Sequence, residues 1–181
     1  MEAQRVSAGR PQTVWEIEPR YTSVQFSCKN FFFFTVKGRF MDFAGAISLD
    51  EDDIRGSSVE TTIKAASINT GNKTRDKHLR SADFLDAEKY PEIRFQSTSV
   101  ERGRDRDALR VTGTLTIKGV SREIVLDVLE TDRSRSPGGD EVAYYTGLIN
   151  LDRFMFGVKY MPGLIGRTIR VMIPTQATRK R

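Results

Sequence analysis

Cysteine and histidine are nearly absent from this chain of 181 residues, which contains one of each, Cys28 and His78. A single cysteine excludes a disulfide within the chain and is typical of a reducing compartment. Zinc needs three or four converging histidine, cysteine or acidic ligands, and catalytic triads need a histidine beside an activated serine or cysteine. His78 lies in a short charged segment, and the chain has no Gly-x-Ser-x-Gly motif. We therefore expect no metal site, no cofactor and no catalytic residue, and we interpret His78 as a hydrogen-bonding residue.

Long apolar runs are missing as well. The longest, four phenylalanines at 31–34, is far too short to cross a bilayer as a helix. Residues 1–12 lack the apolar core of a signal peptide, so we expect a disordered lead-in there and a cytoplasmic protein. With 38% hydrophobic and 29% charged residues, the composition is typical of one soluble globular domain.

The chain also lacks the concentrated charge of a nucleic-acid-binding protein. Its net charge is +5, but its 29 basic residues are interspersed with 24 acids, and no basic–aromatic stripe accompanies them. We therefore expect no nucleic-acid partner. Residues 175–181 are predicted to form a basic tail, and a transient contact with an anionic membrane surface stays open.

Apolar–polar alternation with a period of two residues is what the sequence has in abundance, and it is the pattern of half-buried strands. It runs through Val24, Phe26 and Cys28, and through a longer segment from Leu109 to Ile117. About eight such segments, 8–15 residues apart, are joined by short polar loops. They predict an all-β fold: an eight-stranded antiparallel up-and-down barrel, in which closure removes the free edges.

Two irregularities in this pattern predict local features. The parity of the alternation slips at Met41–Asp42, which predicts a bulge or bend of the kind that barrels use to curve. The polar stretch 132–141, with its Ser-Pro-Gly-Gly core, predicts a solvated loop.

One segment, residues 65–95, is too polar for a core strand and carries helix signals instead. Thr74 stands where a helix N-cap is expected, which predicts a short helix over about 74–81. A further turn follows, and Pro91 prevents helical continuation. We interpret about 74–87 as a helical cap folded over one end of the barrel.

The same segment carries a family resemblance over about 30 residues without a gap. Its matching strings are Ser67-Ile68-Asn69-Thr70, Arg75-Asp76, His78-Leu79, Ser81-x-Asp83-Phe84-Leu85-Asp86 and Tyr90-Pro91-x-Ile93-x-Phe95. Further matches flank it: Trp15-x-Ile17, Val24-x-Phe26, Val36-x-Gly38-x-Phe40 and Gly113-x-Leu115-Thr116-Ile117-Lys118-Gly119-Val120. The chain thus resembles the YceI-like family over residues 13–174. The resemblance implies a lipocalin-like barrel that holds a polyisoprenoid or similar long lipid and has no known catalytic centre.

Three positions depart from the pattern of that family. Histidines are usual at positions 21 and 30, where this chain has Tyr21 and Asn30. The family's Arg-x-Asp-Phe-Gly motif matches Arg153 to Gly157 except that Met155 replaces the aspartate. Any polar interaction of those side chains is therefore in doubt here.

The residues by themselves leave two kinds of interior open. Eight strands enclose just enough space for side chains or for one ligand. The 11 phenylalanines and five tyrosines would fill that space, whereas strand glycines leave gaps. The resemblance favours a ligand cavity, with Arg153 and Lys29 as candidates for contacting a head group. The expected ligand-binding residues are Phe26, Phe33, Val36, Gly38, Phe40, Ile63, Phe84, Phe95, Leu115, Ile117, Tyr144, Arg153 and Phe156.

The expected function is to bind, sequester or carry a long-chain isoprenoid lipid, such as a polyisoprenoid or an isoprenoid quinone. Two alternatives stay open: an enzyme that acts on a lipid within the same cavity, and a structural or stress-associated protein with a filled core. A homodimer also stays open, and the sequence names neither the lipid nor the pathway.

Overall fold

The computed structural model describes residues 13–31, 33–50, 52–105 and 107–179, so the expected lead-in over 1–12 lies outside the described residues. The strands are β1 Thr13–Ile17, β2 Val24–Asn30, β3 Phe34–Phe40, β4 Phe43–Leu49, β5 Ser58–Lys64, β6 Ile68–Asn69, β7 Glu92–Arg102, β8 Ala108–Ile117, β9 Val120–Arg135, β10 Glu141–Asp152 and β11 Ile165–Arg179. The helical elements are α1 Lys73–Arg80 and the 3-10 turns η1 Ile54–Gly56, η2 Ala65–Ser67 and η3 Arg153–Phe156.

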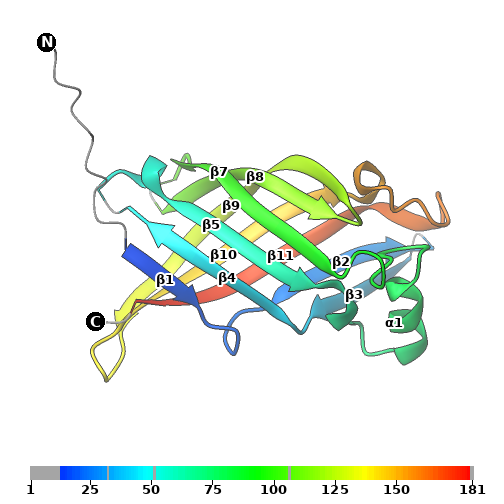
Figure 1. Cartoon of the computed structure of the whole chain (residues 1–181), viewed down its shortest axis with the longest axis horizontal. Coiled ribbons are helices and arrows are strands. Elements are labelled where there is room, and N and C mark those ends of the chain that lie inside the picture. Colours follow the sequence, from blue (N-terminus) through cyan, green and yellow to red (C-terminus); the bar gives the residue numbers. More distant parts are fainter. Residues whose placement is uncertain (1–12, 32, 51, 106, 180–181) are drawn as a thin grey trace, which may run out of the picture.

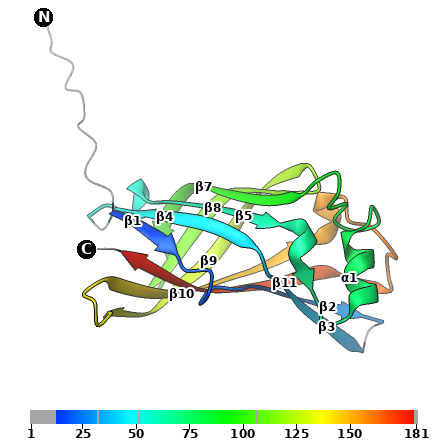
Figure 2. The ribbon, with the colours of Figure 1, turned by 60° about the horizontal axis from the view of Figure 1, so that its bottom comes forward.

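The strands close into an antiparallel barrel with eight wall positions (Figures 1 and 2). Five positions are single strands, β7 to β11, each paired with the next along the chain. Each of the other three is made of two successive strands: β1 with β2, β3 with β4, and β5 with β6. The long strand β11 closes the ring, because its first half pairs with β2 and its far end pairs with β1. The predicted eight-stranded, up-and-down barrel is confirmed.

Short breaks interrupt the strands of the wall, and backbone hydrogen bonds to neighbouring segments continue at the break between β3 and β4. At the predicted slip between β3 and β4, the amide of Met41 donates to the carbonyl of Ser67 over 3.2 Å, and the carbonyl of Asp42 accepts from the amide of Lys64 over 2.9 Å. The break between β1 and β2 contains Pro19, which cannot donate to a ladder. Interruptions of this kind allow strands to follow the curve of a barrel.

Two polar stretches that were predicted to lie outside strands belong to the sheet. β9 continues to Arg135 and β10 begins at Glu141, so the loop is 136–140 rather than 132–141. β11 extends to Arg179, whereas the sequence predicted a tail from residue 175; Ala177 pairs with Ile17 and is fully buried. A barrel strand has one face in water, so it accepts charged side chains at every second position.

The helix α1 covers one end of the barrel, as expected, but it begins one residue earlier than predicted (Figure 1). The N-cap is Asn72, not Thr74: the Oδ1 atom of Asn72 accepts from the amide of Arg75 over 2.9 Å. Asparagine and threonine are both common N-cap residues, so the sequence alone did not separate the two registers.

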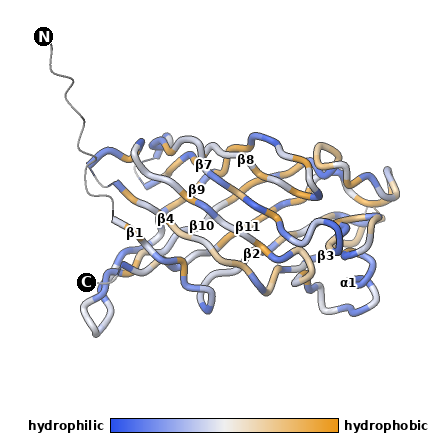
Figure 3. The backbone as a smooth tube through the Cα atoms, in the orientation of Figure 1, coloured by the Kyte–Doolittle hydropathy of each residue, from blue (hydrophilic) through white to orange (hydrophobic). Residues whose placement is uncertain are grey.

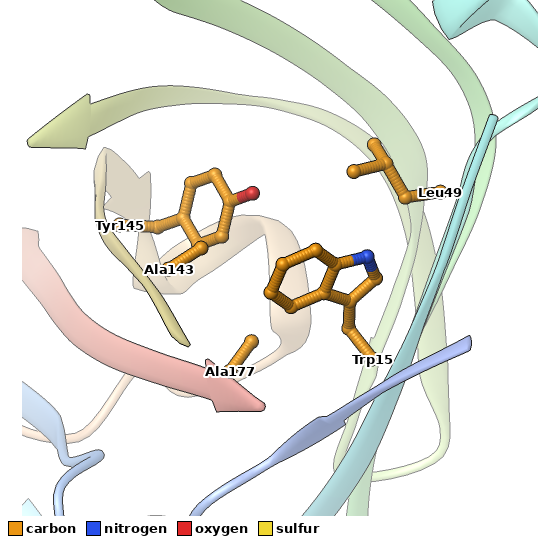
Figure 4. Packing of buried hydrophobic residues seen from close by; sticks show 5 residues of the cluster. All are labelled: Trp15, Leu49, Ala143, Tyr145 and Ala177. Carbon is orange, nitrogen blue, oxygen red and sulfur yellow. The ribbon is translucent and has the colours of Figure 1, made fainter. Parts of the chain in front are cut away.

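The interior is packed near both ends of the barrel. At the end away from α1, Trp15 and Tyr145 pack with Leu49, Ala143 and Ala177 (Figure 4). A second cluster lies nearer to α1, and its buried members are Ala65, Ala87, Ile93, Leu115 and Phe156. Along the strands between them, hydrophobic and hydrophilic residues interleave (Figure 3), which is the pattern of one wet and one apolar face.

Candidate functional site

A cavity of about 510 Å³ fills the barrel, within the range of about 300–1,000 Å³ that is usual for small-molecule sites. It is long and narrow. On β10 its wall includes every second residue from Tyr145 to Leu151, followed by Arg153 in η3. At about 3.3 Å per residue, the part from Tyr145 to Leu151 alone follows roughly 20 Å of strand. The interior is therefore hollow, which disagrees with the filled-core alternative.

The cavity wall is almost entirely apolar because each strand turns alternate residues inward. β2 contributes Val24, Phe26, Cys28 and Asn30; β9 contributes Ile124, Leu126 and Val128; β11 contributes Ile165, Ile169, Val171, Ile173 and Thr175. Among the described residues, no aspartate or glutamate lines the cavity. A void with such a wall holds water poorly and favours an apolar occupant.

At the end away from α1, the cavity meets the buried cluster that contains Trp15 and Tyr145 (Figure 4). Trp15 is 1% exposed, and its indole nitrogen has no hydrogen-bond partner among the described residues. Burial raises the pKa of Tyr145 to about 12. Tyr145 lines the cavity at this end, and Trp15, which does not line it, is buried in the same cluster.

The opposite end is covered by three aromatic rings that contact one another. The imidazole of His78 lies 5.1 Å from the ring of Phe84 and 4.9 Å from the ring of Tyr160, both edge to face, and the last two rings are 5.2 Å apart. All three side chains line the cavity. The Nε2 atom of His78 is also 2.8 Å from a carboxylate oxygen of Asp83, so a hydrogen bond fixes the cap as the sequence indicated.

Thr70 connects α1 to the barrel wall. Asp76 is buried, and its carboxylate accepts from the Thr70 amide over 2.9 Å and from the Thr70 hydroxyl over 2.6 Å. Arg75 donates to the same hydroxyl over 2.8 Å and to the Thr70 carbonyl over 3.0 Å. Arg80 adds bonds to the carbonyls of Ala66 and Ile68. These residues of the motif hold the cap in place.

Arg153 is the most unusual polar residue of the wall, because it is 5% exposed and, within the described part of the chain, its hydrogen-bond partners include no carboxylate. Its guanidinium donates to four backbone carbonyls at 2.7 to 3.0 Å, those of Gly166, Val158, Tyr160 and Ile165. Burial lowers the pKa of Arg153 from its usual value. The side chain thus clamps the segment from Val158 to Gly166 against the end of the barrel.

Two further polar side chains of the wall lie on β2. Cys28 donates its thiol hydrogen to the carbonyl of Gly166 over 3.3 Å, and burial raises the pKa of this thiol. A buried, protonated thiol is a poor nucleophile. Asn30 lines the cavity, and its side-chain oxygen has no hydrogen-bond partner among the described residues. Tyr21, the other position where a family histidine was expected, is 66% exposed.

Most of the residues that the sequence predicted for the site line the cavity: Phe26, Val36, Phe40, Ile63, Phe84, Phe95, Leu115, Ile117, Arg153 and Phe156. Their contact with a ligand stays a prediction. Lys29, the other candidate for a head group, is exposed and lies outside the cavity. Met155, which replaces the family's aspartate, is 47% exposed.

Three predicted residues do not line the cavity. Phe33 lies at the tip of the β2–β3 hairpin and is 89% exposed. Tyr144 faces outward, because the inward residues of β10 are the alternate ones that include Ala143, Tyr145 and Gly147; the register shift beside it leaves the extra residue, Thr131, on β9. Gly38 lies on the inner face, but the ring of Phe26 occupies the space beside it and separates it from the cavity.

The sequence reasoning missed other lining residues. Tyr145, Gly147, Ile149 and Leu151 carry a clear period-2 signal that begins one residue after Tyr144. Tyr160 and Met161 come from an irregular loop, where no periodicity marks which side chains turn inward.

Within the described part of the chain, no group of three or more histidine, cysteine and acidic side chains is arranged to hold a metal ion. That part also contains no helix with the length and hydropathy of a membrane span.

The comparisons with known proteins agree with this architecture. Residues 15–177 match the family model described as YceI-like domain. A UPF0312 protein of Vibrio parahaemolyticus is 35% identical over 142 residues, which cover 78% of this chain and 74% of the relative. The crystal structure of Burkholderia cenocepacia BcnA has a TM-score of 0.78 at 20% identity, with 91% of this chain and 99% of BcnA covered.

A second solved structure is a polyisoprenoid binding domain from Saccharophagus degradans, implicated in plant cell wall breakdown. Its TM-score is 0.68 at 16% identity, with 93% of this chain and 99% of that domain covered. At such identities the two structures support the fold. Together with the family match over most of the chain and the hollow barrel, they lead to one conclusion: the chain belongs to the YceI-like family.

Proposed function

We propose that this protein binds, sequesters or carries one long-chain isoprenoid lipid, such as a polyisoprenoid or an isoprenoid quinone, inside the barrel. The observation that carries the proposal is the elongated cavity of about 510 Å³ with its apolar wall. A long branched hydrocarbon chain fits both properties, because it fills a narrow space and needs no polar partner along its length. The Saccharophagus domain, of the same fold, is described as binding a polyisoprenoid, which supports this ligand class.

Apolar burial alone supplies enough free energy for retention. Each buried CH₂ group contributes about 0.8 kcal/mol, and an isoprenoid chain carries many such groups. Losses of translational, rotational and internal freedom offset a large part of that sum. A polar anchor is therefore not required for tight binding, and specificity comes from the length and width of the cavity.

The polar side chains of the wall suit a weakly polar head group better than a fully charged one. Arg153 already donates four hydrogen bonds to backbone carbonyls, which leaves it little capacity for a further partner. Asn30 offers an acceptor that the described residues leave unbonded. An isoprenoid alcohol, which can donate one hydrogen bond to Asn30, matches this arrangement.

Binding rather than catalysis is also the better match to the groups in the cavity. An acid–base mechanism needs two groups within reach of the same substrate atoms. Among the described residues the wall has no carboxylate, and the thiol of Cys28 is buried with a raised pKa. His78 lies at the edge and is bonded to Asp83.

Mass spectrometry of the purified protein tests the proposal. A native spectrum gives the mass and stoichiometry of any bound molecule, and organic extraction followed by lipid analysis identifies it. We expect one isoprenoid chain per barrel. Extraction of phospholipid alone, or a protein that stays empty after incubation with polyisoprenoid alcohol and quinone, would contradict it. Turnover of the added lipid would instead favour the enzyme alternative.

A further inference from the structure

An exposed aromatic cluster lies at the α1 end of the barrel. Phe33 is 89% exposed, Phe34 is 69% exposed and Phe31 is 46% exposed, all at the tip of the β2–β3 hairpin. The amide of Phe31 donates to the carbonyl of Leu164 over 2.7 Å, which joins the hairpin to the loop before β11; Leu164 is 41% exposed. We call Phe31, Phe33, Phe34 and Leu164 the aromatic tip.

The aromatic tip is not explained by the requirements of the turn or of the core. Hairpin turns favour glycine, asparagine and aspartate, yet Phe31 occupies the left-handed region with φ of 47°. Phe33 and Phe34 stabilise no core, because most of their surface is in water. Clustered exposed apolar residues of this kind mark interaction surfaces.

The aromatic tip lies at the rim of the ligand cavity. Phe31 lines the cavity and is at the same time 46% exposed, so the cavity approaches the surface beside it. Tyr160 and Met161, from the loop that ends next to Leu164, line the same end. A ligand that enters or leaves here passes the aromatic tip.

The barrel face next to the aromatic tip is basic. On β2 and β3 the residues that alternate with the cavity-lining ones include Lys29, Lys37 and Arg39. The register places Arg170 of β11 in one row with Ser27 and Lys37, and Arg39 in the next row with Gln25 and Met172. β11, β2 and β3 lie side by side in the barrel wall (Figures 1 and 2). The register therefore places Lys29, Lys37, Arg39 and Arg170 on the outer face of these strands, which we call the basic face.

Acids are absent from the segments that form this face. Residues 19–41 and 153–181 contain no aspartate or glutamate. Asp152, the acid that precedes the second segment, is bonded to Arg167 over 2.6 Å. The charged residues of the basic face are therefore of one sign, although acids are frequent in the rest of the chain.

We propose that the aromatic tip and the basic face dock the rim of the cavity onto an anionic lipid bilayer. Phenylalanine side chains enter the boundary between head groups and acyl chains, and lysine and arginine are attracted to anionic head groups. Docking would let the lipid ligand pass between the cavity and the membrane without crossing water, and this purpose rests on the proposed function. The docking itself is measurable whether or not a cargo is bound.

A bilayer fits these features better than two other partners. The basic face would attract a nucleic acid, but a nucleic-acid partner would not explain the aromatic tip at the rim of the cavity. A second copy of the chain would bring two basic faces together, which like-charge repulsion opposes.

Flotation of the purified protein with vesicles tests the docking. One set of vesicles is pure phosphatidylcholine, and the other is an equal mixture of phosphatidylcholine and phosphatidylglycerol. We expect binding to the anionic vesicles about tenfold tighter than to the neutral ones, with the difference removed at high salt. The double variant F33S/F34S should weaken binding to both vesicles, and K37E/R39E should remove the preference for the anionic ones.

Matched controls separate docking from general changes in charge or hydropathy. V125S/L129S removes two exposed apolar side chains from β9, and R102E/R104E changes the net charge by the same amount at the end of the barrel away from α1. Both should bind like the parent protein. Extraction from all variants should yield the same amount of bound lipid as extraction from the parent protein. A parent protein without lipid would contradict the proposed function but not the docking.

Three results would overturn the docking proposal. Equal binding to both vesicles at low salt removes the role of the basic face. Unchanged binding of F33S/F34S removes the role of the aromatic tip. If F33S/F34S instead dissociates a dimer, or K37E/R39E loses affinity for DNA while neither variant affects flotation, the surface serves a second copy or a nucleic acid.

Discussion

Arg153 and Cys28 donate to the same acceptor, the backbone carbonyl oxygen of Gly166 in β11, from the two sides of that strand: Arg153 follows β10 and Cys28 belongs to β2. The guanidinium nitrogen Nε of Arg153 is 2.9 Å from that oxygen, and the sulfur of Cys28 is 3.3 Å from it. Gly166 belongs to β11, where a Cβ atom would approach the Lys29 carbonyl to 2.9 Å. The wall of the cavity is thus joined here through backbone groups rather than through a pair of charges.

Replacement of Arg153 by methionine should destabilise the protein by about 2–4 kcal/mol. The substitution keeps much of the volume but removes the Arg153 donor from four backbone carbonyls, of which only that of Gly166 also accepts from Cys28. Each unsatisfied buried group costs about 1–3 kcal/mol. Methionine carries no charge, so the desolvation cost of the buried guanidinium is removed, which offsets part of that loss. Urea unfolding measures the change in the free energy of unfolding.

Arg167→Met is the matched control for Arg153→Met. Arg167 forms an ion pair with Asp152, but its side chain is 65% exposed, so the substitution should cost less than about 1 kcal/mol. Equal effects of the two substitutions would show that the backbone clamp around Gly166 contributes no more than a surface ion pair.

The role of Arg153 illustrates what the sequence could not predict. Its motif suggested a polar function, but its partners are backbone carbonyl groups. Because every residue has such a group, the residue types do not show which carbonyls Arg153 binds. Only the folded path of the loop from Val158 to Gly166 shows which carbonyls converge. Likewise, the motif residues Arg75 and Asp76 were recognisable as a pattern, whereas their common partner Thr70 becomes clear from the geometry.

The barrel itself was predictable because strand periodicity is a local property. The period-2 alternation, the slip at Met41–Asp42 and the helical cap were all readable from neighbouring residues, and the structure confirms them. Which of the two parities faces inward was not readable for every strand. On β10 the prediction chose Tyr144, whereas the inward residues are the alternate ones that include Ala143 and Tyr145, and an error of one residue moves a strand residue from one face to the other.

Two glycines of the wall should respond differently to the same enlargement. Gly147 lines the cavity, and a Cβ atom there would meet the Leu126 side chain at 3.3 Å and Ile173 at 3.6 Å, which a small shift accommodates. We expect Gly147→Leu to fold and to reduce the bound lipid about tenfold or more, because the side chain occupies cavity volume. Extraction and mass spectrometry measure the bound amount.

Gly38→Leu provides the contrast, because a Cβ atom at Gly38 would overlap the ring of Phe26. Overpacking of this kind costs about 1–3 kcal/mol, so a lower melting temperature is expected. A Gly147→Leu protein that keeps its full lipid load would place the ligand elsewhere, and a stable Gly38→Leu protein would mean that Phe26 moves freely.

Truncation of Phe84 should loosen the cap before it unfolds the barrel. The side chain is 7% exposed and packs against His78 and Tyr160 at the end of the cavity. A buried phenylalanine replaced by alanine costs about 3–5 kcal/mol where the site cannot collapse. We expect Phe84→Ala to speed hydrogen exchange in α1 and lipid release together. If the exchange rates rise across all strands as well, the cap and the barrel unfold as one unit.

Removal of His78 should change lipid binding by no more than a few-fold. Its contact with Asp83 is an exposed pair, with side chains 43% and 49% exposed, and such pairs contribute about 0–1 kcal/mol. His78→Ala is compared with the parent protein in lipid affinity and in any turnover of the lipid. A folded variant that cannot bind, or that loses a measurable turnover, would assign His78 a direct role with the ligand.

Alkaline pH should weaken the end of the barrel away from α1 through Tyr145. Burial raises the pKa of its hydroxyl from 10.0 to about 12. The folded-state pKa lies above the unfolded one, so the stabilisation is fully present below about pH 10 and is lost as the pH rises towards 12. The shift corresponds to at most about 3 kcal/mol. Urea unfolding across this range should show that the free energy of unfolding declines less steeply with pH for Tyr145→Phe than for the parent protein. Tyr144→Phe is the control on the outer face. Identical slopes for the parent protein and Tyr145→Phe would mean that the phenol reaches water in the folded state.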